Sequence, residues 1–419
     1  MATKTIKNGG LKMRYDVVLV INDAINSVKA CIKSLAKVEY DKKLINIILV
    51  DNTSVAEITQ ILCSLKQDNN AFGGFEIIQS QKNKGVSFAN NQGANCGSSP
   101  FVFFLNVNAQ VSENLFLELD GAIEKNQNAT AFECRCKPFE TTSHIDPVTL
   151  EKPIADMRAL VIKKDIFVSV GGFDRHLEGQ CAVADLSWQI CAVGAKIQYV
   201  PTAFVTFLTI ENDEDKLFPY IMKHYETLLL NYKYANFAKI LKAEKAYINE
   251  IKRPLHFENV RKELLKKYLK HFCALWHFLF YRFNFDNRAK LKKCEFKSEL
   301  LTDRGREKLE PFSEKPLVSV VIRTYNKKDY LRLALTSIAN QTYKNIEVIV
   351  AEDGEDTAQE MLKKEFSHLN IKYINDGVRK GRGANGNAGL KAASGEYCMF
   401  LDDDDLFYPE HIELFVSKA

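Results

Sequence analysis

The 419-residue sequence lacks the features that mark membrane-spanning and secreted proteins. It has no run of about 18 apolar residues, and its N-terminus, MATKTIKNGGLKMRYD, lacks the apolar core and small-residue cleavage site of a secretory signal. The ten cysteines are scattered, and only Cys134 and Cys136 are close together, which fits neither a disulfide framework nor paired zinc-binding spacing. We therefore expect a cytoplasmic protein with reduced cysteines.

The net charge is small, but the charged residues are unevenly distributed. The net charge is +4, yet residues 261–293 hold ten Lys or Arg against Glu263 and Asp286. The stretch LLKKYLKHF predicts an amphipathic helix, and FCALWHFLFYRFNF after it is apolar nearly all round. Such a helix can lie at a membrane surface and attract anionic lipid. A connecting helix packed between domains is the interpretation that we favour, and no nucleic-acid partner is expected.

One pattern occurs twice along the chain. DVVLVINDA, starting at Asp16, and VSVVIRTYN, starting at Val318, both read as buried strands, and each is followed by a helical stretch and a second apolar run, NIILVDN or NIEVIVAEDG. GVSFANNQG (85–93) then corresponds to GRGANGNAG (381–389). Equal spacing continues beyond these segments, because Asn106 follows the first of them at the distance at which Asp402 follows the second. The repetition indicates an internal duplication.

Strands that alternate with helices at this spacing predict an α/β fold with a mostly parallel sheet and helices on both faces. Ligands bind at the carboxyl ends of the strands in such sheets. Asp51, Glu352, Asp353 and the acidic tetrad at 402–405 all follow predicted strands. They are therefore candidate site residues.

The second copy is the shorter one. It stops about 14 residues after its acidic tetrad and has no counterpart of residues 115–207. A sheet that ends there leaves an uncovered edge and half a core, so the chain is either a truncated form of a longer protein or has an unusually short second domain. The predicted parts are a flexible lead (1–12), a first copy (13–235), a basic helical linker (236–315) and the first half of a second copy (316–419).

The tetrad LDDDD is the most strongly charged candidate. Adjacent carboxylates repel one another unless a cation neutralises them, and Asp oxygens suit Mg²⁺ or Mn²⁺ together with substrate phosphates. A solvated acidic loop explains the same four residues equally well. The tetrad alone does not separate these two interpretations.

Taken together, VSVVIRTYN, VIVAEDG, GRGANGNAGLKAASGEY and FLDDDD resemble the nucleotide-binding half of family 2 glycosyltransferases, which have the GT-A fold. The resemblance implies inverting transfer of a sugar from a nucleotide-diphosphate donor, with UDP favoured, to a glycan or lipid-linked acceptor in cell-surface polysaccharide synthesis. It also implies Mn²⁺ or Mg²⁺ as cofactor.

The resemblance also implies roles for particular residues. The base and ribose pocket would be lined by Thr324, Tyr325 and Asn326. Glu352 or Asp353 would hydrogen-bond the base. The metal and diphosphate would be held by Asp402, Asp404 and Asp405. In the family's ARN step Asn387 matches, but Gly386 replaces the Arg, and Arg382 is a candidate replacement for its charge.

The family's general base lies in an acidic ED step downstream of the metal-binding residues, and the second copy stops before it. In the first copy GGFD (171–174) is intact, but AVADLSWQ (182–189) has Ala182 and Val183 in place of the acidic pair. Four further features depart from the family. Gln189 replaces an Arg, and Phe207 replaces the later His. Asn106 and Asn108 replace the metal-binding carboxylates, and Asn22, Asp23 and Ala24 replace the TYN step. We therefore predict a first copy that no longer transfers sugar. A shifted alignment, with Glu178 or Asp174 as base, is the alternative.

Two other functions compete with this prediction. Gly381, Gly383 and Gly386 spell the G-x-G-x-x-G of dinucleotide-binding enzymes, but they follow the third strand of their copy rather than the first, so we disfavour that function. A non-catalytic glycan- or protein-binding scaffold is favoured if Ala419 is the natural end, because neither copy then holds a complete set of donor, metal and base residues. A chain that continues to an ED step favours the transferase, which is our prediction.

Overall fold

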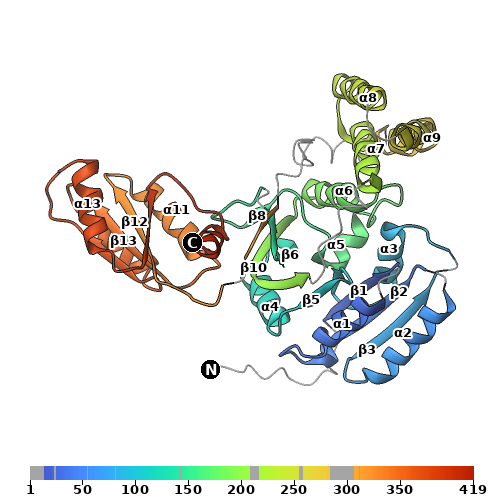
Figure 1. The fold of residues 1–419 in the computed structure, drawn as a ribbon, viewed down its shortest axis with the longest axis horizontal. Helices are drawn as coiled ribbons and strands as arrows, with labels where there is room; N and C mark the ends of the chain where they lie inside the picture. Colours follow the sequence, from blue (N-terminus) through green and yellow to red (C-terminus); the bar gives the residue numbers. More distant parts are fainter. Residues whose placement is uncertain are drawn as a thin grey trace. The chain divides into compact units, whose positions relative to one another are not determined.

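A computed structural model describes residues 14–22, 25–53, 55–80, 82–141, 144–207, 217–253, 258–283, 306–310 and 312–419 (Figure 1). The predicted lead at 1–12, Asp23, Ala24 and the 284–293 part of the basic segment lie outside these residues. The chain forms two compact units, one of residues 1–137 and 152–305 and the other of residues 138–151 and 306–419.

The first unit begins with four parallel strands in the order β3-β2-β1-β4. These strands are β1 (Tyr15–Ile21), β2 (Ile45–Asp51), β3 (Gly74–Gln79) and β4 (Phe101–Leu105). Between them run α1 (Ile25–Leu35), α2 (Ala56–Asp68) and α3 (Val86–Cys96). The strands are almost continuously apolar because helices cover both of their faces.

The same sheet continues beyond β4 in the order β9-β6-β10-β5, with β9 antiparallel to β4. The added strands are β5 (Ala109–Val111), β6 (Ala129–Lys137), β9 (Ala159–Lys163) and β10 (Lys196–Phe207). The helices here are α4 (Leu115–Lys125), α5 (Lys164–Ser169) and α6 (Gly179–Ala192). One apolar core joins the sheet to α1, α2 and α4, and a second joins its other face to α3, α5 and α6 (Figure 1).

Three more helices belong to the first unit: α7 (Leu217–Tyr234), α8 (Phe237–Lys252) and α9 (Glu258–Phe283). They bury Leu229, Leu264 and Phe278 in the core that also contains α6. Much of the segment predicted as a linker is therefore packed onto the first unit. Among the described helices, none combines the length and the apolar character needed to cross a bilayer.

The second unit repeats the four-stranded arrangement, in the order β14-β13-β12-β15 and all parallel. Its strands are β12 (Val318–Thr324), β13 (Ile346–Glu352), β14 (Ile371–Ile374) and β15 (Tyr397–Asp402). Its helices are α11 (Lys328–Ala339), α12 (Gln359–Glu365), α13 (Arg382–Ala392) and α14 (His411–Lys418). A two-stranded ribbon of β7 (Phe139–Thr141) and β11 (Arg306–Lys308) also belongs to this unit.

Strand register shows that the two copies align. Ile21 pairs with Asp51 and Thr324 with Glu352, while the pairing of β4 and β15 with their neighbours places Asn106 where the second copy has Asp402. The predicted duplication and α/β fold are confirmed. The predicted match of the TYN step to Asn22, Asp23 and Ala24 is wrong by one residue. The strand register matches Thr324 to Ile21 and Tyr325 to Asn22. The first copy therefore still has a polar side chain in place of the aromatic ring.

Close packing of helix on strand is also the same in both copies. A Cβ on Gly93 of α3 would lie 2.4 Å from Val18 Cγ1, and one on Gly389 of α13 would lie 2.5 Å from Val321 Cγ1. Only glycine allows this approach.

No described element of the second unit covers the predicted edge. β15 ends the described sheet, and Phe400 on it is 50% exposed. Its counterpart Phe104 is 1% exposed and packs against Phe167 and Phe173, which follow β9 in the first unit. The second unit has no described segment that does the same for Phe400.

Candidate donor and metal site

The acidic tetrad lies at the carboxyl end of β15, as predicted, and basic side chains already balance it. Asp402 forms an ion pair with Arg323 from β12, and Asp404 Oδ2 accepts a hydrogen bond from Lys327 Nζ at 2.7 Å. Both carboxylates are about half exposed. Hydrogen bonding to Lys327 holds the pKa of Asp404 below its usual value. The backbone N–H of Asp405 donates to Asp402 O at 3.0 Å, which closes the turn.

Arg323 was missed in the sequence, because its role depends on the space beside Gly386 on a different element. A Cβ on Gly386 would lie 3.1 Å from Arg323 Cδ, so the glycine that replaces the family's Arg makes room for a guanidinium from a neighbouring strand. Arg382, the predicted substitute, is exposed at the first turn of α13 and also lowers the pKa of Asp404. Three cationic side chains therefore lie around the acidic strand end.

The carboxylates of Glu352 and Asp353 both accept hydrogen bonds from nearby loops. Glu352 is buried and accepts hydrogen bonds from the Thr357 and Ala358 backbone N–H groups at 3.1 and 3.2 Å, and from the Tyr373 hydroxyl. Asp353 accepts from the backbone N–H groups of Lys380 and Gly381 at 2.6 and 3.0 Å. These contacts shape the loops after β13 and before α13.

Thr324, Tyr325 and Asn326 follow one another at the end of β12. Thr324 is buried, and its hydroxyl has no hydrogen-bond partner among the described residues. Tyr325 is 43% exposed, with the Arg379 guanidinium 4.3 Å from its ring centroid. Asn326 has a left-handed backbone with φ of 55°. The exposed ring and the guanidinium form a platform on which a base can stack.

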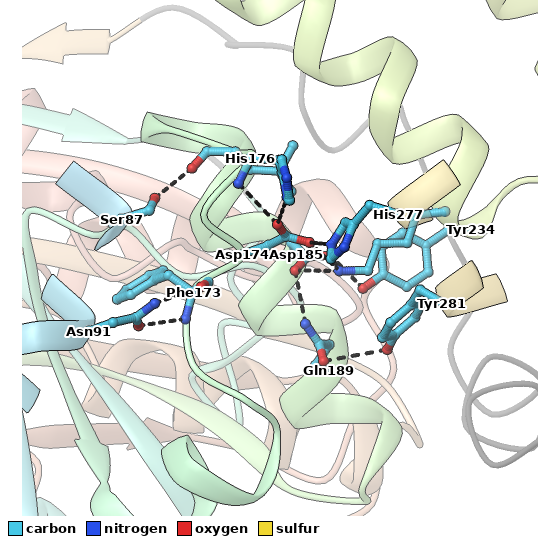
Figure 2. Close-up of polar contacts among 12 residues, drawn as sticks. Ser87, Asn91, Phe173, Asp174, His176, Asp185, Gln189, Tyr234, His277 and Tyr281 are labelled. Atoms are coloured by element: carbon cyan, nitrogen blue, oxygen red, sulfur yellow. Dashed lines mark hydrogen bonds and ion pairs between the residues drawn. The ribbon is translucent and has the colours of Figure 1, made fainter. Parts of the chain in front are cut away.

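Asn387 is exposed, and its counterpart shows what else an Asn can do there. Asn91 donates to Phe173 O at 2.8 Å and accepts from the Phe173 N–H at 3.0 Å, so it holds the GGFD loop by both ends of its amide (Figure 2). The second unit has no described loop in that place.

The N-termini of α3 and α13 differ most between the copies. In the first unit the Glu178 carboxylate accepts from the Val86 and Ser87 N–H groups at 3.0 and 3.2 Å, and a Cβ on Gly85 would overlap it. Beside Gly381 and Gly383 in the second unit there is open space. A helix N-terminus favours an anion. The first unit places the Glu178 carboxylate beside the Val86 and Ser87 N–H groups, whereas in the second unit the Asp353 carboxylate accepts only from the Lys380 and Gly381 N–H groups just before the first turn of α13.

The metal-binding positions of the first unit carry no charge. Asn106 Oδ1 accepts from the Asn108 N–H at 2.9 Å and so closes the turn after β4. Val183, where the family has the acidic step, is 1% exposed within the core. Neither Asn106 nor Val183 supplies a carboxylate.

Asp185, the acid that remains near Val183, is buried and fully engaged (Figure 2). Its carboxylate lies 2.7 Å from Lys233 Nζ of α7 and accepts from the Tyr234 hydroxyl at 2.6 Å and from Gln189 Nε2 at 2.9 Å. The ammonium comes from a helix outside the recognisable motifs, so the sequence offered no signal for it.

The two alternative bases are engaged as well. Glu178 holds the N-terminus of α3 as described above, and burial raises its pKa. Asp174 contacts His176, His277 and Lys233, each through a carboxylate oxygen at 3.0 to 3.2 Å (Figure 2).

Comparison with known proteins adds the following. Residues 16–174 and 319–419, together more than half of the chain, match the family described as Glycosyl transferase family 2. Glycosyltransferase GlyA of Streptococcus pneumoniae is 40% identical over 103 residues, which cover 24% of this chain and 15% of GlyA. The GalNAc(5)-diNAcBac-PP-undecaprenol beta-1,3-glucosyltransferase of Campylobacter jejuni is 36% identical over 107 residues, covering 25% of this chain and 35% of the enzyme. The chain thus spans about a third or less of these relatives.

Among solved structures, the mannosyltransferase PcManGT from Pyrobaculum calidifontis, in complex with GDP-Man and Mn²⁺, has a TM-score of 0.43 and 14% identity. The match covers 68% of this chain and 86% of that one.

Proposed function

Since this chain belongs to glycosyl transferase family 2, we propose that its second unit binds the diphosphate end of a nucleotide-sugar donor for inverting transfer to a glycan or lipid-linked acceptor. One observation carries this proposal. The frame that the two copies share is charged at Asp402 and Asp404 and open at the N-terminus of α13, whereas in the first copy it is neutral at Asn106 and filled by Glu178.

The donor set at the tetrad fits a hard divalent cation. Asp402 and Asp404 present carboxylate oxygens that are half exposed, and Mg²⁺ and Mn²⁺ favour such ligands together with phosphate. The cation, Mn²⁺ or Mg²⁺, would stabilise negative charge on the leaving diphosphate as a Lewis acid. Arg323, Lys327 and Arg382 would add positive charge for the same diphosphate, and the N-terminus of α13 would favour an anion.

The nucleoside would lie on the end of β12. Tyr325 and Arg379 offer the stacking surface, and Asn326 follows it. Glu352 acts as a loop anchor in this proposal, and Asp353 binds the base only by giving up a backbone contact. A uridine donor is favoured by the family resemblance.

We propose that the first unit does not catalyse transfer. Transfer needs a carboxylate that can take the proton of the acceptor hydroxyl. Val183 cannot accept a proton, and Asp185 is neutralised by Lys233. The first unit would instead bind acceptor glycan or support the second. A lipid-linked acceptor accords with the undecaprenol-linked substrate in the name of the Campylobacter relative.

Calorimetric titration with UDP, in the presence and absence of Mn²⁺, tests the site. We expect metal-dependent binding that the double variant Asp402→Asn, Asp404→Asn weakens by at least about tenfold, because a charge-assisted contact is typically worth more than 1.4 kcal/mol. The matched control is Asn106→Ala, Asn108→Ala, which should bind as the parent does. Loss of binding in the control instead would place the donor site in the first copy.

A non-catalytic scaffold is the competing function. If UDP, GDP and dTDP all fail to bind with Mn²⁺ or Mg²⁺ present, the transferase proposal is wrong and the scaffold is supported. Binding without transfer or hydrolysis of the matching nucleotide sugar would restrict the proposal to donor binding.

The outer face of α9 supports contact with a membrane surface. Leu265, Leu269, Trp276 and Phe280 lie on one stripe of this helix and are 46 to 77% exposed. Arg261, Lys262 and Lys266 are exposed beside the stripe in its first half. An aromatic stripe flanked by cations suits the interface of an anionic bilayer.

Co-sedimentation with vesicles tests this contact. We expect binding to vesicles that contain phosphatidylglycerol, and a several-fold loss in Trp276→Ser, Phe280→Ser. Phe237→Ser, which removes a 72% exposed ring from α8, is the control and should bind as the parent does. Equal losses in both variants would contradict a specific α9 surface.

A further inference from the structure

A cluster of two histidines and an aspartate lies in the first unit. Asp174 and His176 belong to the loop after the GGF turn, and His277 comes from α9, about a hundred residues later. One ligand atom from each residue, two ring nitrogens and a carboxylate oxygen, lies within 4.8 Å of the others (Figure 2). We propose that Asp174, His176 and His277 bind a divalent transition metal, with Zn²⁺ as the ion best suited.

The distances between the three side chains suit the binding of one metal ion by all of them. His176 Nδ1 is 3.0 Å from Asp174 Oδ1, and His277 Nε2 is 3.0 Å from Asp174 Oδ2. Zinc bonds to His and Asp are about 2.1 Å long, so ligand atoms of a tetrahedral site lie about 3.4 Å apart. The two imidazole rings have centroids 4.3 Å apart, and both present a nitrogen to the carboxylate. Small side-chain shifts therefore suffice to admit the ion.

The supporting contacts hold the ligands in place. The backbone N–H of His176 donates to Asp174 Oδ1 at 3.0 Å, and Lys233 Nζ donates to Asp174 Oδ2 at 3.2 Å. Contacts of this kind orient the ligands of metal sites. Lys233 does not make the cluster positive, because it also lies 2.7 Å from Asp185. Two carboxylates share one ammonium, and the excess negative charge favours a cation.

The donor set decides which ion fits. Imidazole suits Zn²⁺, Co²⁺, Ni²⁺ and Cu²⁺, whereas Mg²⁺ and Mn²⁺ prefer oxygen ligands such as those of the 402–405 tetrad. His277 is 42% exposed, so the fourth position faces solvent and can take water. The two proposed sites therefore differ in preferred metal, and either one can fail without the other.

Binding would join α9 to the GGFD loop. Because the ligands come from distant segments, the ion binds the folded unit and stabilises it by mass action. Both tryptophans, Trp188 and Trp276, belong to the first unit, and Trp276 precedes a ligand in the chain. Their fluorescence thus reports on this unit.

The test is a calorimetric titration of the chelator-treated full chain with Zn²⁺, in excess Mg²⁺ and in the background Asp402→Asn, Asp404→Asn. We expect one Zn²⁺ per chain, a rise in the Tm followed by tryptophan fluorescence, and visible absorption bands when Co²⁺ replaces Zn²⁺. The variants His176→Asn and His277→Gln should each weaken binding by more than about a hundredfold, since even supporting contacts cost 10–100-fold. His368→Gln, an exposed His of the second unit, should leave it unchanged.

The proposal is wrong if the parent in this background takes up no Zn²⁺, or if His277→Gln and His176→Asn bind it as tightly as His368→Gln does. Each variant is compared without metal first, so that a lower Tm in the absence of Zn²⁺ identifies a folding defect. A variant that folds as the parent does and has lost the Zn²⁺-dependent rise in Tm supports the site.

Discussion

The two copies of the strand-helix frame differ in where each keeps a carboxylate. At the amino end of the sheet the first copy has Asp16, which accepts from Asn46 Nδ2 at 3.0 Å and from the Ser99 hydroxyl and N–H at 2.7 and 2.9 Å. The second copy has Ser319 at that position, and Glu347 on the next strand takes over, accepting from Ser319 and from the Gly395 N–H. The buried carboxylate lies on a different strand in each copy, and in both copies it accepts hydrogen bonds from the donors around it.

At the turn after the last parallel strand only the second copy has acids, Asp402 and Asp404, where the first has Asn106 and Asn108. Asp16 and Glu347 are almost wholly buried among donors, so loss of either would leave polar groups unpaired at a cost of about 1–3 kcal/mol. Asp402 is half exposed, and an Asn at the equivalent position satisfies the same turn. Packing therefore requires the first kind of carboxylate but not the second.

We expect the largest effect on stability at the two glycines that occupy the same place in both copies. Gly93→Ala and Gly389→Ala each place a Cβ within 2.5 Å of a valine methyl, so we expect each to destabilise its own unit by about 1–3 kcal/mol. Gly121→Ala on α4 is the control, since nothing lies within 4 Å of its Cβ, and it should stabilise by about 0.5–1 kcal/mol.

Urea unfolding separates these effects. Tryptophan fluorescence reports on the first unit, and far-ultraviolet circular dichroism reports on both. Unequal costs at Gly93 and Gly389, or a cost at Gly121 as large as theirs, would argue against identical helix packing in the two copies.

A smaller test uses a buried acid for which the second copy has no described counterpart. Glu226 on α7 is 1% exposed, and desolvation raises its pKa from 4.5 to about 8. The folded first unit therefore keeps a proton on Glu226 that the unfolded chain releases. The stability that this proton contributes is fully present below pH 4.5 and is lost as the pH rises through about 8. The expected slope is at most about 1.4 kcal/mol per pH unit.

Glu226→Gln should flatten this slope, whereas Glu57→Gln on the exposed face of α2 should preserve it. Tryptophan-detected urea unfolding between pH 5 and pH 8 measures both. A parent whose first unit gains stability over this range would show that Glu226 is ionised in the folded state.

Much of the site could be predicted from the sequence, but its contacts could not. Apolar runs and equal spacing placed Asp402 and Asn106 at equivalent strand ends, and the register confirms this. The TYN step was misplaced by one residue because strand boundaries are weak local signals, and pairing with the neighbouring strand settles them. Arg323 was overlooked because its role depends on the space beside Gly386, on a different element.

The sequence by itself determined the duplicated frame, its mostly parallel sheet and the amides at Asn106 and Asn108 in place of Asp402 and Asp404, because these follow from hydropathy, spacing and residue chemistry along a short stretch. Only the tertiary structure decided that Glu178 occupies the N-terminus of α3, that Lys233 neutralises Asp185, and that His277 joins Asp174 and His176. These partners lie about 40 to 100 residues apart in the chain. Their meeting depends on how helices pack on the sheet, which no local pattern encodes.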